Sequence, residues 1–561
     1  MNYIPFYLAV SQSIGSPQAN QLLQILKIKG YPTLRVFFLT ALWLCLLLRT
    51  SVCQSQHKYQ EPHRPQFHFT PPEKWMNDPN GMVYYQGEYH LFYQYYPDAT
   101  VWGPMHWGHA VSKDLMHWKH LPIALYPDSL GYIFSGSAVV DWNNTSGFGK
   151  NGKPPLVAIF TYHDMEKERA KLPNTQSQAI AYSNDRGRTW IKYAGNPVIP
   201  NPGTIRDFRD PKVIWHAPSK QWVMALAVGD HVELWGAPDL KKWTYLSSFG
   251  QEYGSHGGVW ECPDLFPIKV EGATEEKWVL IVNINPGHPN GGSGTQYFVG
   301  QFDGKNFVLD PTFKPDVSKN HAVWMDWGRD HYAAVTWSDV PVKDGRRLLI
   351  AWMSNWDYAT RVPTEAWRSG ATLPREITLH KTGNSYRLKS MPIKELEKLR
   401  SKTKKLPQGA LASGRLLAES PAGKPLCYEV MLEIDLAKTT AIGFSIYLSN
   451  ALNQRYEIGY DIQAKEFFSD RKYSGDLSFA DNFAKKAHKA PRFSNDNILP
   501  IRLYIDAASA ELFADQGETC LTELFFPTGG FTKIHLHAIG GEVWIKSGMI
   551  SRVKSTVRLH D

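Results

Sequence analysis

Past residue 60 the apolar residues come in short runs, and polar turn residues separate one run from the next. Such runs lie at residues 82–85, 157–160, 222–226 and 348–352, each bounded by Gly, Pro, Asn or Asp. Apolar runs this short, with this punctuation, are typical of β-strands joined by turns. The pattern therefore predicts an all-β chain.

A turn pattern also recurs in this region, in which an Asp precedes an aromatic residue by four or five positions. The anchoring residues are Asp114, Asp185, Asp239 and Asp303, which lie 71, 54 and 64 residues apart. A polar hairpin tip followed by an inward-packing aromatic, repeated every 50–70 residues, is typical of the outer hairpins of propeller blades. Residues 60–385 then have room for a five-bladed β-propeller.

The pattern changes after this region. Residues 386–405 are expected to form a linker, and within it the spacing of Ile393, Leu396 and Leu399 predicts a short helical connector over residues 389–405. Beyond it, alternating segments such as 428–434 predict a separate antiparallel β-sandwich over residues 406–561. The expected fold class is thus all-β, a five-bladed β-propeller followed by an antiparallel β-sandwich.

Composition adds a hint about the ligand. Aromatic residues make up 13% of the 561 residues, including 20 Trp, which suits strands and sugar-stacking surfaces. The net charge is +8, but residues 1–53 contain four basic residues and no acid, so the remainder carries only +4. Because no dense Lys/Arg run accompanies this weak charge, we expect no nucleic-acid partner.

The first 53 residues resemble a leader. Thirteen mostly apolar residues at 36–48 follow basic residues and precede Ser51-Val52-Cys53, a small-x-small pattern suited to cleavage before Gln54. This predicts a signal peptide within residues 1–53 and a secreted protein. The alternative is an uncleaved signal-anchor that tethers the protein to a membrane, although 13 helical residues span only about 20 Å of a hydrocarbon core about 30 Å thick.

Cysteine usage and short motifs exclude other classes. Outside the leader only Cys262, Cys427 and Cys520 remain, which is no disulfide framework. Neither a C-x-x-C pair nor an H-E-x-x-H motif occurs, so we expect no metal site. Asn143 and Asn144 begin overlapping N-glycosylation sequons, which matter in a eukaryotic host.

Three acidic segments, at residues 75–81, 206–211 and 260–264, are candidates for chemistry. They contain Asp78, Asp210 and Glu261. Because the innermost strands of a propeller converge on one axis, acids this far apart in sequence can meet in one pocket. Paired carboxylates of this kind hydrolyse glycosides, one attacking the anomeric carbon and the other protonating the leaving oxygen. Taken singly, the segments also fit a turn, a surface ion pair and a strand end.

The neighbours of these acids suggest separate roles. The amides of Asn77 and Asn80 would keep Asp78 ionised, as a nucleophile needs. Desolvation by Trp260 would raise the pKa of Glu261, as an acid/base needs. The adjacent Arg209 would hold Asp210 charged, which suits a stabiliser of positive charge.

Together the three segments resemble the signature of glycoside hydrolase family 32, which includes invertases, levanases, inulinases and fructan exohydrolases. Trp75-Met76-Asn77-Asp78-Pro79-Asn80-Gly81 resembles the nucleophile motif, Arg209-Asp210-Pro211 the stabiliser motif, and Glu261-Cys262-Pro263-Asp264 the acid/base motif. The resemblance implies a propeller with an appended sandwich, a retaining double displacement at fructose, and no cofactor. Local motifs also resemble the family's fructose-binding set at Asn77, Gln94, Trp102, Phe134, Ser135, Arg209 and, more weakly, Trp356.

The resemblance implies sucrose and β-fructan oligosaccharides or polysaccharides as substrates and no stable membrane partner. The alternatives are an exo-levanase or exo-inulinase that prefers polymers, a transfructosylase in which a sugar replaces water, and a catalytically silent sugar-binding protein. The segment at residues 183–190 also resembles a sialidase Asp-box, but the arginine cluster and Tyr nucleophile of a sialidase cannot be assembled from the sequence.

Overall fold

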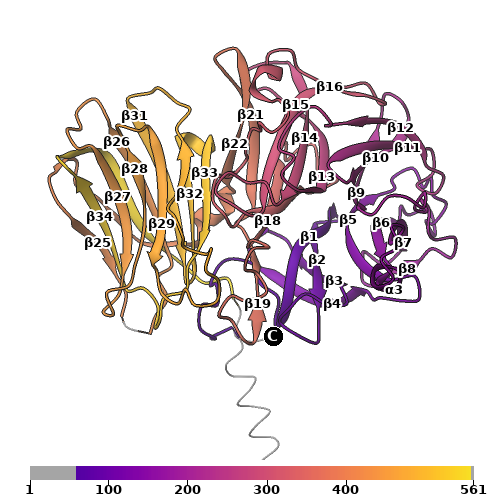
Figure 1. The fold of residues 1–561 in the computed structure, drawn as a ribbon, viewed down its shortest axis with the longest axis horizontal. Coiled ribbons are helices and arrows are strands. Elements are labelled where there is room, and N and C mark those ends of the chain that lie inside the picture. Colours follow the sequence, from indigo (N-terminus) through magenta and orange to yellow (C-terminus); the bar gives the residue numbers. More distant parts are fainter. Residues whose placement is uncertain (1–58, 422, 558–561) are drawn as a thin grey trace, which may run out of the picture. The chain divides into compact units, whose positions relative to one another are not determined.

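The computed structural model describes residues 59–421 and 423–557, and within these residues seven β-sheets account for nearly all regular structure. Five of the sheets come from the first part of the chain and surround a common axis, as Figure 1 shows in indigo to pink. The innermost strands are β1, β5, β9, β13 and β17, and each contacts the next around the ring, with β17 returning to β1. This arrangement confirms the expected five-bladed β-propeller.

The first three sheets are antiparallel meanders, except that a short strand pairs in parallel with β1. Their strands are β1 (Lys74–Tyr85), β2 (Glu88–Tyr96), β3 (His106–Ser112), β4 (Trp118–Leu125) and the parallel β19 (Trp367–Arg368); β5 (Tyr132–Val140), β6 (Leu156–His163), β7 (Gln176–Ser183) and β8 (Ile191–Lys192); and β9 (Phe208–His216), β10 (Gln221–Val228), β11 (His231–Ala237) and β12 (Thr244–Phe249).

The fourth and fifth sheets complete the ring. Their strands are β13 (Val259–Lys269), β14 (Glu276–Asn285), β15 (Gly294–Phe302) and β16 (Phe307–Leu309); and β17 (Tyr332–Thr336), β18 (Arg347–Met353), β20 (Gly370–Ala371), β21 (Arg375–Thr382) and β22 (Ser385–Pro392). A short helix, α3 (Met165–Arg169), lies between β6 and β7, and a 3₁₀ turn, η1 (Lys314–Asp316), follows β16.

The recurring Asp-aromatic pattern forms the outer hairpin turn in each of the first four sheets. Asp185 Oδ1, between β7 and β8, accepts hydrogen bonds from the backbone N–H groups of Arg188 (3.0 Å) and Thr189 (2.9 Å). Asp114, Asp239 and Asp303 accept equivalent bonds from the residues two and three positions later. A carboxylate that closes its own turn explains why Asp recurs there.

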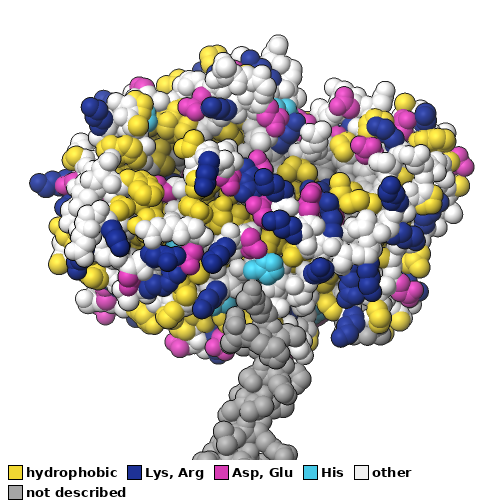
Figure 2. Space-filling view, turned by 180° about the vertical axis from the view of Figure 1, so that it is seen from behind, with side chains coloured by type: hydrophobic (Ala, Val, Ile, Leu, Met, Phe, Trp, Pro, Cys, Tyr) yellow, Lys and Arg dark blue, Asp and Glu magenta, His cyan; other side chains and the backbone are white. Residues whose placement is uncertain are grey.

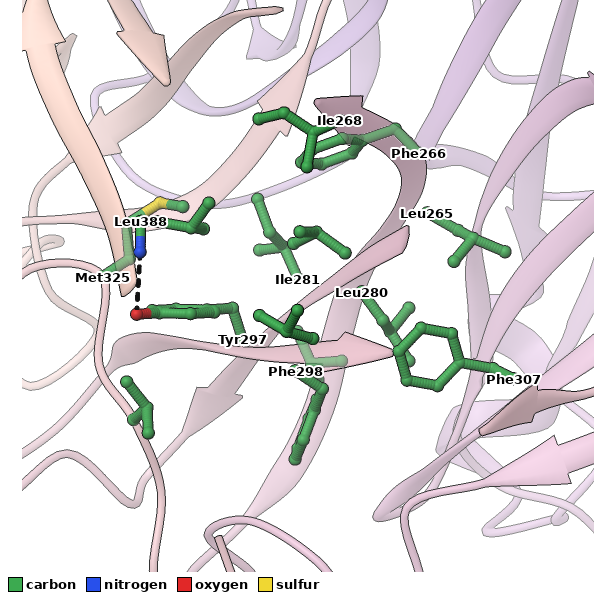
Figure 3. Close-up of a cluster of buried hydrophobic side chains, with 14 of the residues drawn as sticks. Leu265, Phe266, Ile268, Leu280, Ile281, Tyr297, Phe298, Phe307, Met325 and Leu388 are labelled. Atoms are coloured by element: carbon green, nitrogen blue, oxygen red, sulfur yellow. Dashed lines mark hydrogen bonds between the residues drawn. The ribbon is translucent and has the colours of Figure 1, made fainter. Parts of the chain in front are cut away.

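Apolar side chains fill the spaces between neighbouring sheets. Figure 3 shows one such layer, in which Leu265, Leu280 and Phe298 from β13, β14 and β15 pack together. The same layer reaches the fifth sheet, where the backbone N–H of Leu388 in β22 donates to the Tyr297 hydroxyl (3.1 Å). The fourth and fifth sheets are therefore joined by packing and by a buried hydrogen bond.

The helical connector expected over residues 389–405 is reduced to a 3₁₀ helix of six residues, because strands occupy both of its flanks. Residues 385–392 alternate between partly exposed and buried positions and form β22, the outer strand of the fifth sheet. Ile393, Leu396 and Leu399 are three residues apart, a spacing that fits the three-residue turn of a 3₁₀ helix, and η2 (Lys394–Leu399) follows β22. β23 (Arg400–Lys405) then pairs with the last strand of the sandwich.

The remaining strands form the two sheets of the predicted sandwich, with the buried apolar residues of both sheets between them. One sheet contains β23, β24 (Gly409–Leu411), β26 (Tyr428–Asp435), β31 (Ile498–Asp506), β32 (Ser509–Ala514), β33 (Thr519–Leu524) and β35 (Val543–Val553). The other contains β25 (Arg415–Glu419), β27 (Gly443–Ser449), β28 (Arg455–Asp461), β29 (Glu466–Tyr473), β30 (His488–Pro491) and β34 (Lys533–Ile539), and the turn η3 (Asp515–Gly517) lies between β32 and β33.

Buried ion pairs join the propeller to the sandwich. Arg375 on β21 donates to Glu511 on β32 (2.6 Å) and to Asp326 (2.9 Å), and all three side chains are fully buried. Arg471 on β29 pairs in the same way with Asp330 (2.8 Å). Charges buried this deeply need their partners, so these contacts hold the two domains in one arrangement.

Other surface features complete the description. On the face in Figure 2, Lys and Arg side chains are interspersed with Asp and Glu, and hydrophobic side chains show between them. Across residues 59–421 and 423–557, no helix has the length and apolar character needed to cross a membrane. The predicted leader at residues 1–53 lies outside the described residues.

Candidate active site

All ten residues predicted to act on or bind the substrate line one cavity of about 390 Å³ at one end of the propeller axis, which we call the carboxylate cavity. They come from the starts of β1, β5, β9 and β13, from β2, and from two loops. The residues are Asn77, Asp78, Gln94, Trp102, Phe134, Ser135, Arg209, Asp210, Glu261 and Trp356. The sequence-based expectation that these segments converge is therefore met by the geometry.

A break in strand pairing occurs at the cavity on every innermost strand. The register shifts between Met76 and Pro79 on β1, between Ile133 and Gly136 on β5, opposite Asp210 on β9, between Glu261 and Asp264 on β13, and between Tyr332 and Val335 on β17. Consecutive residues of a regular strand face opposite sides. At these bulges both members of Asn77-Asp78, Phe134-Ser135 and Arg209-Asp210 line the cavity.

Left-handed backbone accompanies the bulges. Asp210 has φ = 65°, Cys262 has φ = 45° and Ala333 on β17 has φ = 53°. Non-glycine residues rarely adopt this conformation, and it concentrates at functional sites. Gly81 after the first bulge has φ = 54°, and a Cβ there would lie 2.6 Å from the Phe92 ring, so no other residue fits.

Asp78 is partly buried and lies between two hydrogen-bond partners. Its Oδ2 accepts a hydrogen bond from the Ser135 hydroxyl (2.6 Å) and a weaker one from the Cys262 thiol (3.7 Å), while its Oδ1 has no partner among the described residues. Burial, reinforced by the charge of Glu261, raises the pKa of Asp78 to about 6 despite the bonds that Ser135, Asn77 and Cys262 donate.

Asp210 faces Asp78 across the same thiol. Its Oδ2 accepts from the backbone N–H of Cys262 (3.0 Å) and from the Cys262 thiol (3.6 Å), and the Arg209 guanidinium lies 3.9 Å away. Burial is the largest influence and raises the pKa of Asp210 to about 7, against the lowering effect of Arg209. Two acids that share one small cavity disfavour ionisation of each other.

Glu261 is the acid with the strongest donors. Arg209 Nη2 donates to its Oε1 (2.8 Å), and the Tyr332 hydroxyl donates to its Oε2. Arg209 is itself fixed by Asp207, whose Oδ1 accepts from Nη1 (2.5 Å). The Glu261 side chain thus has a defined position beside the other two acids while retaining 20% exposure.

The expected causes of the acids' ionisation were wrong in three respects. The Asn80 amide nitrogen donates no hydrogen bond, and burial raises the pKa of Asp78 where we expected it to stay ionised. Trp260 lies in the core, stacked on His256, because strand alternation turns it away from Glu261. Arg209 approaches Glu261 and Asp207 more closely than Asp210, whose pKa burial raises.

Aromatic rings form the wall of the cavity. Trp102 meets Phe134 edge to face at 6.0 Å, and Phe134 stacks on His163 at 4.2 Å. Trp356 stacks on Trp75 at 6.0 Å, and the Trp75 indole N–H donates to Asn77 Oδ1 (2.8 Å). These contacts fix apolar faces next to an oriented amide, a combination that suits a sugar ring.

Sequence reasoning missed several residues of the site. Tyr332 lies in no motif that we recognised, and only the bulge on β17 brings its hydroxyl to Glu261. Six further residues line the cavity without a predicted role: His163, Met165, Glu168, Gln176, Arg206 and Asp207. Arg206 and Asp207 lie in the acidic segment 206–211, and the other four carry no local signature. Their positions depend on how β6, α3, β7 and the chain before β9 pack.

Other sequence features lie away from this site. The Asp-box resemblance at residues 183–190 is an outer hairpin turn of the second sheet. Cys427 and Cys520 are free and buried, as is Cys262. The described part of the chain holds no group of three or more His, Cys, Asp or Glu side chains placed to bind a metal ion.

Comparisons with known proteins agree with this geometry. The family model for the glycosyl hydrolases family 32 N-terminal domain matches residues 68–392, and that for the family 32 C-terminal domain matches residues 395–553. A levanase of Bacillus subtilis is 47% identical over 93% of this chain and 75% of its own length. An extracellular exo-inulinase of Aspergillus awamori is 39% identical over 89% of this chain and 96% of its own length.

Solved structures give the same result. The exo-inulinase of Aspergillus awamori superimposes with a TM-score of 0.81 at 37% identity, covering 89% of this chain and 100% of that chain. A β-fructofuranosidase of Schwanniomyces occidentalis, complexed with fructosyl-erythritol, gives a TM-score of 0.78 at 32% identity, covering 89% and 99%. With both domain models matched across residues 68–392 and 395–553, this chain belongs to glycosyl hydrolase family 32 and is a glycosidase.

Proposed function

We propose that this protein releases terminal, non-reducing β-D-fructofuranosyl residues from sucrose and β-fructans by a retaining double displacement. The observation that carries the proposal is the meeting of three carboxylates from three different blades in one cavity. Asp78 acts as the nucleophile, Glu261 as the acid/base, and Asp210 holds the sugar and balances positive charge.

In the first step, the Asp78 carboxylate attacks C2 of the fructosyl unit while Glu261 gives its proton to the leaving oxygen. A covalent fructosyl ester forms on Asp78, and the rest of the substrate departs. A proton on Glu261 removes the negative charge that raises the pKa of Asp78. Mutual repulsion disfavours the state in which both carboxylates are ionised, so transfer of a proton to one of them favours ionisation of the other.

In the second step, Glu261 takes a proton from water, and the hydroxide attacks C2 and breaks the ester. Arg209 and Tyr332 keep the Glu261 carboxylate in place between the two proton transfers. The second attack restores the configuration at C2, releases fructose and returns Asp78 to its ionised form.

The other lining residues hold the fructosyl unit. Asn77, Gln94 and Arg209 offer donors to the hydroxyls, and Trp102 and Phe134 offer apolar faces to the ring carbons. Ser135 supports Asp78 directly through its hydroxyl. Trp356, stacked on Trp75, borders the same cavity.

Relatives support fructan as a substrate, since the Bacillus subtilis relative is a levanase and the Aspergillus awamori relative an exo-inulinase. An enzyme that prefers polymers and a transfructosylase remain the alternative forms of the same chemistry. A silent binding protein is disfavoured because Asp78, Asp210 and Glu261 are all retained in one cavity.

Initial rates of fructose release on sucrose, inulin and levan test the proposal. We expect the wild-type protein to release fructose. In Asp78→Asn the rate of release should fall on the order of 1,000-fold or more, because removing the nucleophile eliminates the covalent route. Asp496→Asn, which alters an exposed carboxylate in the sandwich, is the matched control. Equal, background-level release by wild type and Asp78→Asn on all three substrates would refute the proposal.

We also propose that the leader directs secretion, with cleavage before Gln54. The relative from Aspergillus awamori is named extracellular. Amino-terminal sequencing of protein from the culture medium is expected to begin at Gln54. Retention of the whole chain in the membrane fraction would favour the uncleaved signal-anchor.

A further inference from the structure

We propose that the opposite end of the propeller axis holds a second binding site, for a neutral oligosaccharide. A cavity of about 510 Å³, larger than the carboxylate cavity, lies there, and we call it the distal cavity. It lies toward the ends of β5, β9 and β13, whose starts contribute Phe134-Ser135, Arg209-Asp210 and Glu261 to the carboxylate cavity. On β5, β9 and β13 the nearest lining residues of the two cavities are only two to four positions apart, for example Asp210 and Lys212 on β9, which is about 7–13 Å along the strands.

Four tryptophans provide apolar faces in the distal cavity: Trp142, Trp215, Trp222 and Trp278. Trp142 is 60% exposed, and its indole N–H donates to Asp339 Oδ1 (2.8 Å). Trp215 and Trp222 meet edge to face at 5.2 Å, and the Trp222 indole N–H donates to the Thr145 hydroxyl (2.8 Å). Hydrogen bonds thus fix the orientations of both rings; Trp142 leaves much apolar area uncovered, whereas Trp222 is 4% exposed and supports Trp215 from within the core.

Unsatisfied polar groups lie among these rings. Asp264 is fully buried and lines the distal cavity, yet its Oδ1 has no partner among the described residues, and the same holds for the Ser338 hydroxyl. Buried polar atoms are nearly always hydrogen-bonded in native proteins. A ligand that both donates and accepts hydrogen bonds, as a sugar hydroxyl does, would satisfy a carboxylate and a hydroxyl together.

The charges in the distal cavity favour a neutral ligand over an anion. Lys212 is paired with Asp264 (3.1 Å), so its charge is compensated. Arg347 lies over the Phe266 ring at 4.9 Å and donates to the Pro267 carbonyl (3.3 Å), while Glu276 and Asp339 add negative charge. Flat aromatic faces with a few mixed hydrogen-bonding groups match the two sides of a sugar, its C–H face and its hydroxyl edge.

The site can be tested by binding, without relying on hydrolysis or on the proposed function. The probe is a four-unit β-2,1-linked fructo-oligosaccharide titrated calorimetrically into Asp78→Asn, which prevents turnover. Because Asn143 also lines the distal cavity, the protein is produced in a host that attaches no N-glycans. We expect two sites per chain, one in each cavity.

Two substitutions in the Asp78→Asn background distinguish the sites. Trp142→Ala is expected to weaken one site about tenfold, and Trp102→Ala the other, since each removes one stacking face. Trp142→Phe should restore most of the affinity, and Tyr473→Ala, which removes a 68%-exposed aromatic in the sandwich, should change neither site. Trp142 is mostly exposed, so its loss leaves the fold intact.

The outcomes separate the two proposals. A single site that Trp142→Ala weakens would support the distal cavity and count against the carboxylate cavity as a fructan site. A single site that only Trp102→Ala weakens would overturn the distal site. Two sites that are both insensitive to Trp142→Ala would also overturn it, because the second would then lie elsewhere.

Discussion

The hydrogen bond from Ser135 to Asp78 gives the most quantitative test of the proposed mechanism. The hydroxyl lies 2.6 Å from Oδ2 and stabilises the ionised form, so it lowers the pKa of Asp78, which burial nevertheless raises to about 6. Ser135→Ala removes this stabilisation, and the pKa of Asp78 rises further. Because the nucleophile must be ionised, the acidic limb of activity moves to higher pH.

The size of the effect follows from the bond. A hydrogen bond to a charged group contributes about 1.5–3 kcal/mol, and 1.36 kcal/mol corresponds to one pH unit. Water that enters the vacated space would restore part of the stabilisation of the ionised carboxylate, so we expect the acidic limb of the pH profile to move up by about one pH unit. At pH 5, below both limbs, kcat/KM then falls by about tenfold beyond any change seen at pH 8.5.

The assay is kcat/KM for sucrose from pH 4 to 9, since this parameter reports ionisations of the free enzyme. Ser478→Ala is the matched control, because its hydroxyl also donates to a carboxylate, Asp476 (2.7 Å), on the exposed surface of the sandwich. A Ser135→Ala profile that is lower at every pH but has an unmoved acidic limb would refute the reasoning, since Ser135 would then contribute to binding alone.

Three further predictions concern other groups. Asp78→Asn is expected to stabilise the protein, because raising the pKa of this partly buried carboxyl from 3.8 to about 6 costs about 3 kcal/mol above pH 6. The stabilisation, about 3 °C in unfolding temperature, should be present at pH 7.5 and absent below pH 4, where the carboxyl is protonated in both the folded and the unfolded chain, and an equal difference at both pH values would contradict it. Glu261→Gln should lower kcat/KM by about 100- to 10,000-fold on sucrose but by less than about tenfold on a fructoside with a nitrophenolate leaving group, because that leaving group needs little protonation. Equal losses on the two substrates would argue against Glu261 as the acid. Arg375→Met leaves the carboxylates of Asp326 and Glu511 buried without their partner and should lower the free energy of unfolding by about 3–5 kcal/mol in urea titrations, whereas a change below about 1 kcal/mol would show that the interface tolerates the loss.

Much of the architecture follows from local rules that a sequence displays. Asp185 and its counterparts close the turns they mark, so the repeat was visible before the fold. The linker expected at residues 386–405 differs from the structure because a three-residue apolar spacing fits both an α-helix and a 3₁₀ helix, while residues 385–392 alternate as a strand does. The apolar pattern of the sequence therefore predicts a propeller and a sandwich, but it does not locate the boundary between these two domains.

The residues of the site were predictable where a motif carried them and hidden where only packing places them. Asp78, Asp210 and Glu261 lie in motifs, whereas Tyr332 reaches Glu261 from a different sheet, without a motif of its own. The pKa values were misjudged for the same reason. Asn80 and Trp260 are close in sequence to Asp78 and Glu261, but alternation along a strand turns adjacent side chains to opposite faces, as it does for Trp260. For Asp78, burial raises the pKa more than hydrogen bonds from its neighbours lower it.

The five bulges explain how one ring of strands supplies so many polar groups to so small a cavity. A regular strand presents only every second side chain to the axis, so five strands would offer about one residue each at a given level. The bulges bring in consecutive pairs, and Arg209-Asp210 places a guanidinium and a carboxylate at the same level. Asp210, Cys262 and Ala333 adopt left-handed φ angles at these bulges, a conformation that costs free energy in residues other than glycine. Cys262 and Ala333 directly follow Glu261 and Tyr332, which are hydrogen-bonded to each other. Further along the same strands, the distal cavity combines tryptophan rings with a few charged groups such as Asp264 and Lys212, so a ligand there would meet aromatic faces beside mixed hydrogen-bonding groups.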